Sequence, residues 1–356
     1  MINYNELKEL YRISSPSGRE FKMVNYIDKK LRTLGATTYR DKFNNLYATK
    51  GDSLTYPCIV AHTDEVHNTK PKGFAVKQLG DMLIGFNTRT SVFSGIGADD
   101  KNGIWIALKC FEIFDDIKAA FFVSEEIGCV GSSGADMTFF YDCRFVIQCD
   151  RKGNSDFISE ASGVELCSKD FVKDSNLKAF RYKEAKGAMT DVMELKYNNL
   201  KISACNISCG YYNPHTSEEY TNLKDLGNCL SLVCHIINNC TDVYPHEYKA
   251  KAYNWIAPNK YDSFDFWQKE DAKNDSYISY DWSKKYEMRS DDLFGNPPYD
   301  SLEYERIKAY IEREILRDGA IEPIRLFDDI IELYPMTDEA DIEMAYEEVT
   351  GCPMFS

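Results

Sequence analysis

The chain passes from a flexible loop into a helix at Ser94-Gly95-Ile96-Gly97-Ala98-Asp99-Asp100-Lys101-Asn102-Gly103. Two adjacent carboxylates, Asp99 and Asp100, come just before a series of apolar residues at helical spacing: Ile104, Ala107, Leu108, Phe111 and Ile113. The positive end of a helix dipole favours negative charge, so an acidic helix cap explains this stretch on its own. Acidic and histidine residues elsewhere in the chain favour a second interpretation, in which Asp99 belongs to a functional site.

Four apolar runs have the composition of strands that are buried on both faces, and polar residues follow each of them. The runs cover residues 57–61, 118–123, 143–149 and 202–208. The polar residues that follow them are His62, Asp64, Glu125, Glu126, Asp150 and His215. Functional sites of α/β proteins form beyond the carboxyl ends of the strands, so we expect these side chains to lie close together.

Helical patterns alternate with the apolar runs. They cover residues 4–35 as two helices, the stretch from Asp99 to about Phe114, and residues 222–239. Short strands are expected at residues 39–49, and antiparallel strands at residues 72–93 around Gly80-Asp81. This alternation predicts an α/β fold with a mixed, mostly parallel central sheet flanked by helices.

The charge of the chain is unevenly distributed. The 356 residues carry a formal net charge of −15, and residues 241–356 contain 27 Asp and Glu against 13 Lys and Arg. The remaining 30 acidic and 29 basic residues leave residues 1–240 almost neutral. No basic stripe suits a phosphate backbone, which argues against nucleic acid as a partner. No apolar run is long enough to span a bilayer and no secretory signal is visible, so we expect a cytoplasmic protein without a membrane partner.

The charge distribution and a change of composition predict two parts. Residues 1–244 form the predicted catalytic domain, and residues 245–356 form an acidic, aromatic-rich extension that is irregular over 245–299 and helical over 300–350. The twelve cysteines include no CxxC pair, and many lie in apolar runs, which favours reduced thiols in the core.

Two imidazoles and several carboxylates form a ligand set suited to zinc, cobalt or manganese. His62 and Asp64 are two positions apart on a strand end, so Asp64 could hold the His62 ring in its metal-binding tautomer. Each polar residue alone has an ordinary explanation, such as a turn acid or a surface pair. Seven such residues, counting Asp99, occupy topologically equivalent positions, and a metal site explains this coincidence better than chance does.

With these motifs in order, residues 1–240 resemble the co-catalytic di-zinc exopeptidases, which include tripeptidase T and the bacterial leucyl and glutamyl aminopeptidases. The matching segments are Ser15-Pro16-Ser17-Gly18-Arg19-Glu20, Ala61-His62-Thr63-Asp64, Gly97-Ala98-Asp99-Asp100-Lys101-Asn102-Gly103, Ser124-Glu125-Glu126-Ile127-Gly128, Asp150, and Pro214-His215-Thr216-Ser217-Glu218-Glu219. The resemblance implies the three-layer sandwich of the zinc exopeptidases and phosphorylase/hydrolase-like proteins.

The resemblance also implies ligands for two divalent metals, zinc with cobalt or manganese as alternatives. It makes Asp99 the bridge between the metals, with His62 and Asp150 on one and Glu126 and His215 on the other.

The resemblance further implies the catalytic groups. Glu125 is the expected general base, which moves a proton from a metal-bridging water to the leaving amine, and Asp64 orients His62. The peptide bond between Asp99 and Asp100 is expected to be cis, a rare geometry for residues other than proline.

Two gaps in the sequence are short for this family. Only 37 positions separate His62 from Asp99, and 65 separate Asp150 from His215, so the branch without an inserted lid domain fits best. The segment Gly187-Ala188-Met189-Thr190-Asp191-Val192 is similar to a Thr-Asp segment of the glutamyl aminopeptidases, and a helix N-cap is its expected role.

The function expected from these features is metal-dependent cleavage of N-terminal residues from short peptides, by an aminopeptidase or a di- or tripeptidase. An amidohydrolase that removes an acyl group from an amino acid would use the same metal pair. A non-catalytic binding or scaffolding protein that recruits a partner through the acidic extension is an alternative of another class. A cysteine hydrolase using Cys149 is a third, but no histidine is expected beside that thiol. The expected partner is the peptide substrate. Residues 245–356 could join two copies of the chain in a homo-oligomer, cover the edge of the cleft or take the place of a lid, and the sequence leaves these three roles open.

Overall fold

The computed structural model describes residues 4–67 and 70–248. Further along the chain it describes six single residues: Lys308, Ile311, Ile342, Tyr346, Val349 and Thr350. The chain divides into two compact units, Met1–Ala257 and Pro258–Ser356, and the fold described below is that of the first. The predicted irregular segment 245–299 and helical segment 300–350 lie largely outside the described residues, so they stay predictions, as does the oligomer contact assigned to them.

Nine strands of the described region form one central sheet. They are β1 (Thr37–Arg40), β2 (Leu46–Lys50), β3 (Tyr56–His62), β7 (Ile117–Phe122), β8 (Cys143–Arg151), β9 (Asp156–Ala161), β10 (Val164–Glu165), β11 (Lys183–Gly187) and β12 (Ala204–Ser208). Their order is β1-β2-β7-β3-β8-β12-β9-β10, with β11 paired to β9. The four middle strands β7, β3, β8 and β12 are parallel, and antiparallel pairs lie toward both edges.

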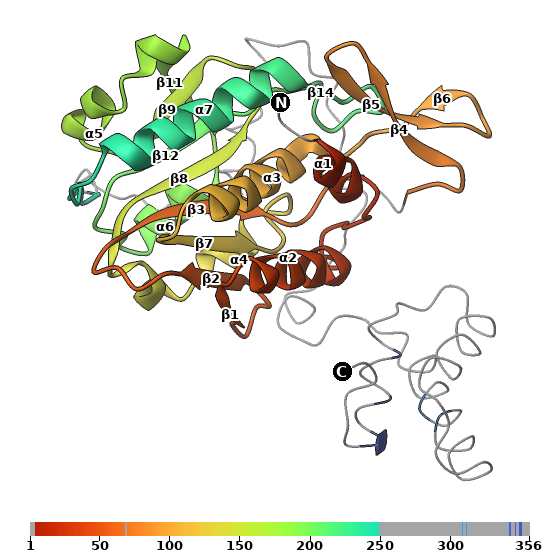
Figure 1. Ribbon diagram of the computed structural model, residues 1–356, viewed down its shortest axis with the longest axis horizontal. Helices are drawn as coiled ribbons and strands as arrows, with labels where there is room; N and C mark the ends of the chain where they lie inside the picture. Colours follow the sequence, from red (N-terminus) through yellow and green to blue (C-terminus); the bar gives the residue numbers. More distant parts are fainter. Residues whose placement is uncertain are drawn as a thin grey trace, which may run out of the picture. The chain divides into compact units, whose positions relative to one another are not determined.

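Helices cover both faces of this sheet, which confirms the predicted α/β fold (Figure 1). On one face lie α1 (Asn5–Leu10), α2 (Phe21–Thr33), α3 (Ala98–Ile113), α5 (Lys169–Asp174), the 3-10 helix η2 (Leu177–Phe180) and α7 (Leu223–Asn239). On the other lie α4 (Val130–Ser133), the 3-10 helix η1 (Met137–Phe140) and α6 (Asp191–Tyr197). The predicted helices at 4–35, 99–114 and 222–239 therefore form.

Two apolar layers explain why the middle strands are apolar along their whole length. In β3, Ile59 and Ala61 pack into the core beneath α3 and α7, whereas Cys58 and Val60 pack into the core beneath α6. Successive side chains of a strand point to opposite faces, so a strand covered on both sides needs apolar residues at every position. All seven residues of β3 are buried, His62 included.

A second, smaller sheet carries one of the candidate site residues. It contains β4 (Phe74–Leu79), β5 (Met82–Asn87), β6 (Val92–Phe93), β13 (Tyr211–Tyr212) and β14 (Tyr220–Asn222). The antiparallel strands predicted at 72–93 are confirmed as β4, β5 and β6. Sequence patterns did not predict β13 and β14, because two or three residues show no periodicity. β13 pairs with β14, and β14 pairs with β5, so the loop between β13 and β14, which carries His215, lies at this sheet.

The helix predicted to follow Thr190 is α6, but Thr190 does not cap it with its side chain. The Thr190 hydroxyl donates instead to Oε1 of Gln148 over 2.6 Å, and the same oxygen accepts from the backbone N–H of Val192 over 3.1 Å. Thr190 is therefore the N-cap residue of α6, as the sequence predicted, but its own side chain does not bond to the first turn. Gln148, a polar residue inside β8, thus supplies the hydrogen-bond acceptor for a backbone N–H in the first turn of this helix.

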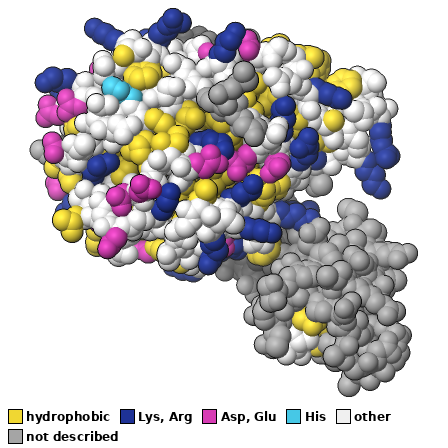
Figure 2. All heavy atoms as spheres, viewed as in Figure 1, with side chains coloured by type: hydrophobic (Ala, Val, Ile, Leu, Met, Phe, Trp, Pro, Cys, Tyr) yellow, Lys and Arg dark blue, Asp and Glu magenta, His cyan; other side chains and the backbone are white. Residues whose placement is uncertain are grey.

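The surface and the thiols agree with the composition. On the face shown in Figure 2, acidic and basic side chains are interspersed over the first unit, as its nearly balanced charge leads one to expect. The eleven cysteines of the described region are free, and most of them are buried. Within the same region, no helix is both long and apolar enough to cross a bilayer.

Removing part of the β3 core should destabilise the first unit. Ile59 is fully buried in the middle of the sheet, so we expect Ile59→Ala to lower the free energy of unfolding by about 2–5 kcal/mol. Leu54 is 94% exposed, so Leu54→Ala should change it by less than about 0.5 kcal/mol. Urea denaturation of both variants in chelator measures the difference, and equal effects would contradict the buried position of β3.

Candidate active site

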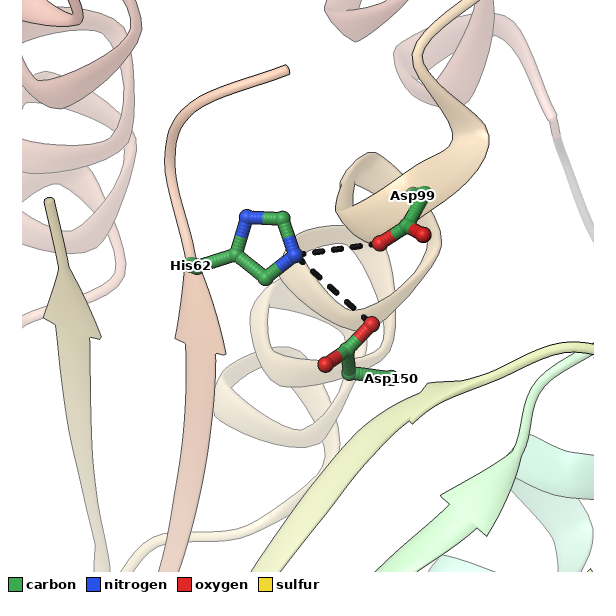
Figure 3. A group of neighbouring side chains, drawn as sticks. All are labelled: His62, Asp99 and Asp150. Carbon is green, nitrogen blue, oxygen red and sulfur yellow. Dashed lines mark hydrogen bonds and ion pairs between the residues drawn. The ribbon is translucent and has the colours of Figure 1, made fainter. Parts of the chain in front are cut away.

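The first group of site residues lies where two strands meet the start of a helix (Figure 3). His62 ends β3, Asp150 lies near the end of β8, and Asp99 lies at the beginning of α3. Nε2 of His62 is 3.0 Å from Oδ1 of Asp99 and 3.6 Å from Oδ1 of Asp150. Because β3 and β8 are parallel neighbours, their carboxyl ends bring His62 and Asp150 to the same edge of the sheet.

Asp99 is presented by an irregular backbone. Gly97 has a φ of 66°, Asp99 and Asp100 have non-helical dihedral angles, and the peptide bond between these two residues is cis, as the resemblance implies. The side chains of Asp99 and Asp100 point in different directions. Asp99 faces the two histidines, whereas Asp100 accepts from the backbone N–H groups of His62 and Gly103.

The second group contains Asp99 again, together with Glu126 and His215. Nε2 of His215 is 3.4 Å from Oδ2 of Asp99 and 3.1 Å from Oε2 of Glu126. Glu126 follows β7 in a turn, and His215 lies on the loop between β13 and β14 with a φ of 64°. Two loops and a helix start, rather than neighbouring strands, therefore build this group.

The two groups suit two cations that share one carboxylate. In each group the candidate ligand atoms all lie within 4.8 Å of one another. The other carboxylate oxygen of Glu126, Oε1, is buried without a hydrogen-bond partner. A buried carboxylate oxygen without a donor is costly unless a cation meets it. Imidazole nitrogens and carboxylate oxygens are ligands that zinc accepts, so the residues present fit a divalent metal.

Asp64 connects the first group to the Glu125–Glu126 turn. Its Oδ1 is 3.3 Å from Nδ1 of His62 and accepts from the backbone N–H of Glu125 over 2.9 Å. Its Oδ2 accepts from the Ser17 hydroxyl and from the backbone N–H of Glu126. The ring nitrogen Nε2 of His62 is thereby left to face Asp99 and Asp150.

Glu125 and Glu126 lie in a turn and not in an extended continuation of β7. Ser124 has a φ of 56°, and the backbone N–H groups of Gly128 and Cys129 both donate to the Glu125 carbonyl. The chain therefore turns directly after β7. The turn, and not strand alternation, sets the directions of the two carboxylates.

The electrostatics of the site favour positive charge. Burial raises the pKa of Asp150, and the nearby charge of Asp99 raises it further. Burial would also raise the pKa of Asp99, but its hydrogen bonds to His215 and His62 hold that pKa well below its usual range. Although burial opposes it, the charge of Glu126 and the hydrogen bond to Asp99 raise the pKa of His215 to about 12. Cations of any kind are thus stabilised among these carboxylates.

Three further residues hold the candidate ligands in place: Tyr211 and Gln148, which the sequence analysis did not name, and Glu20, which ends one of the matching segments. The Tyr211 hydroxyl donates to Oδ1 of Asp150 over 3.3 Å, and the amide of Gln148 donates to Oδ2 over 3.2 Å. Oε1 of Glu20 accepts from both the backbone N–H and the hydroxyl of Ser124, at the start of the turn. A polar Gln148 within an apolar run was a visible signal. Tyr211 gave none, because aromatic residues are common in strands.

Comparison with known proteins supports the fold. No protein-family model matches the sequence, and a comparison with curated proteins finds no match either. Solved structures do match. The aminopeptidase PepT of Bacillus cereus superposes with a TM-score of 0.55 at 14% identity, over 67% of this chain and 98% of that one. The chain has the fold of such peptidases.

Two further structures agree. A tripeptidase of Staphylococcus aureus gives a TM-score of 0.54 at 15% identity, over 67% of this chain and 99% of that one. An aminopeptidase of the archaeon Desulfurococcus kamchatkensis gives 0.52 at 14% identity, over 65% and 94%. The predicted resemblance to the zinc exopeptidases is therefore confirmed as a resemblance of fold.

Glu20 should make stability depend on pH. Burial and the charge of Asp64 raise its pKa from 4.5 to about 7, so the folded chain holds a proton that the unfolded chain releases. This contribution to stability is complete below about pH 4.5 and is lost as the pH rises through 7. It amounts to at most about 3 kcal/mol.

Glu20→Gln should remove that dependence. Urea denaturation in chelator at pH 4.5 and pH 8 isolates it, because differences in hydrogen bonding that do not depend on pH cancel between the two conditions. Identical pH dependence in the wild type and the variant would show that Glu20 is charged in the folded protein.

Proposed function

We propose that this protein is a metal-dependent exopeptidase that removes N-terminal residues from short peptides. One observation supports the proposal more than any other: two groups of three ligand residues share the single carboxylate of Asp99, with Glu125 next to one of those ligands. A shared carboxylate suits a pair of metals that act together on one substrate. The fold, which the compared aminopeptidases and tripeptidases also have, is consistent with it.

The proposed ligands divide between two cations, zinc with cobalt or manganese as alternatives. His62, Asp99 and Asp150 would hold one, and Asp99, Glu126 and His215 the other. When bound, such metals polarise a scissile carbonyl and lower the pKa of water.

Glu125 is the proposed general base and acid. Its carboxylate would take a proton from the attacking water and give it to the nitrogen of the leaving amine, so that the proton balance closes within one residue. The Glu125 backbone N–H donates a hydrogen bond to Asp64, which also contacts His62, so Asp64 fixes the position of the Glu125 backbone relative to His62. Burial raises the pKa of Glu125 well above its usual range, and the charges of Asp150 and Asp191 add to this, against the charge of His62. A group with a raised pKa holds its proton more readily before donating it.

Replacing Glu125 tests the base. We expect Glu125→Gln to lower kcat by a factor of about 10²–10⁴ with an unchanged metal content, because glutamine cannot accept the proton. Glu165→Gln, on the exposed position of β10, is the matched control and should keep full activity. Full peptidase activity of Glu125→Gln with normal metal content would refute this role.

Removal of metal tests the class of enzyme. Elemental analysis of the purified protein should find two equivalents of zinc, cobalt or manganese. A chelator should abolish hydrolysis of aminoacyl anilides, and added metal should restore it. Undiminished hydrolysis by protein shown to be free of metal would contradict the proposal, and tightly bound metal without any hydrolysis would favour a binding protein.

A substrate panel separates the two hydrolases that fit the site. Peptide and acyl-amide hydrolysis pass through the same kind of tetrahedral transition state, so the metal ligands do not distinguish them. We expect dipeptides and tripeptides with a free N-terminus to be cleaved faster than N-acetylated amino acids. The reverse order would assign the site to an amidohydrolase that removes acyl groups.

A further inference from the structure

Glu219, four residues after His215, is a buried carboxylate that is not among the candidate metal ligands. Its side chain accepts hydrogen bonds from the backbone of the segment that leads into Asp99. Its Oε2 accepts from the backbone N–H of Ile96 over 3.1 Å and from that of Gly97 over 2.7 Å. Its Oε1 accepts from the backbone N–H of Asp99 over 3.2 Å. Nε2 of His67 lies 2.8 Å from Oε2. One side chain from the His215 loop therefore holds the whole segment that leads into Asp99.

The two candidate metal groups differ in what holds them. His62 and Asp150 lie on neighbouring strands, and the ladder between β3 and β8 fixes their separation. His215 lies on a loop, and its ring is 40% exposed. Glu219 connects this loop to the Asp99 segment by three hydrogen bonds to backbone N–H groups. The position of His215 relative to Asp99 thus depends on Glu219, whereas that of His62 relative to Asp150 does not.

A second buried carboxylate, that of Glu65, also lies against the Asp99 segment. Gly97 packs so closely against the Glu65 carboxylate that any side chain at position 97 would overlap it. Glu65 in turn pairs with Lys101 over 2.9 Å and with Lys70. None of these three residues belongs to the His215 loop. Of the two buried carboxylates around this segment, Glu219 alone links it to the second group.

We propose that Glu219 is a positioning residue for the second metal: it sets the separation of Asp99 and His215 and thereby governs cation binding by Asp99, Glu126 and His215. The inference rests on the proposed function, because it takes these residues to be metal ligands. A carboxylate is required because both of its oxygens accept hydrogen bonds. In Glu219→Gln, an amide NH₂ replaces one of these oxygens and faces backbone N–H donors, so the segment must shift.

The test is a cobalt titration of the chelator-treated, full-length protein, followed by the visible absorption of the bound Co²⁺. The wild type should bind two equivalents. In Glu219→Gln we expect the first equivalent to bind within about 3-fold of the wild type and the second to weaken by about 10–100-fold, as is usual when a group that orients a ligand is lost. The absorption of the second equivalent should change as well. Glu218→Gln alters the exposed neighbour on the same loop and should leave both equivalents unchanged.

Each other outcome has a definite meaning. Two equivalents bound by Glu219→Gln with wild-type affinities would overturn the role of Glu219 and leave the proposed function intact. Equal weakening of both equivalents, with a lower Tm, would also overturn it, because Glu219 would then stabilise the fold as a whole. A wild type that binds no cobalt would overturn the proposed function, and this inference with it.

A second variant keeps the test decisive if Glu219→Gln does not fold. His67→Ala removes one partner of the carboxylate and leaves the three backbone hydrogen bonds in place. It should weaken the second equivalent by a smaller factor of about 2–5, below the usual range for groups that orient a ligand directly. Unchanged binding of the second equivalent in His67→Ala would then overturn the role of the Glu219 contacts.

Discussion

The geometry of the site depends on where the Asp99 carboxylate is held. One oxygen of this carboxylate meets His62 and the other meets His215, so a small displacement would affect both groups at once. The side chain alone cannot provide this precision. The positive φ of Gly97 and the hydrogen bond from the Asp99 backbone to Glu219 help to fix the direction in which the carboxylate points.

Concentrating carboxylates at one edge of a sheet has an electrostatic cost. Burial raises the pKa values of Asp150, Glu125 and Glu126, and like charges nearby add to the effect. The two imidazoles offset part of this repulsion, because His62 contacts three carboxylates and His215 contacts two. A divalent cation would offset more of it, since its charge is larger and its bonds to oxygen replace the lost hydration. The arrangement therefore favours metal binding over an empty, protonated site.

Much of the site could be predicted because strand ends leave a strong signal in the sequence. A strand that is covered on both faces is apolar at every position, so the residue at which polarity returns marks the edge of the sheet. That rule located His62, Asp150 and the Glu125–Glu126 turn. It could not give the conformation of the turn, which depends on a positive φ at Ser124. Serine rarely adopts a positive φ, so the residue type gave no signal of it. Nor could it find Tyr211, whose contact with Asp150 joins residues 61 positions apart.

The segment between His62 and Asp99 illustrates a further limit of sequence patterns. Its length indicated only that it is too short for an inserted domain. In the structure its strand β5 pairs with β14, which directly follows the His215 loop, and the Gly85 carbonyl accepts from the backbone N–H of Ser94 at the start of the Asp99 segment. The hairpin thus contacts both parts of the chain that build the second group. A short segment between two candidate ligands can therefore support the loop of a third, and only the pairing of strands distant in sequence reveals it.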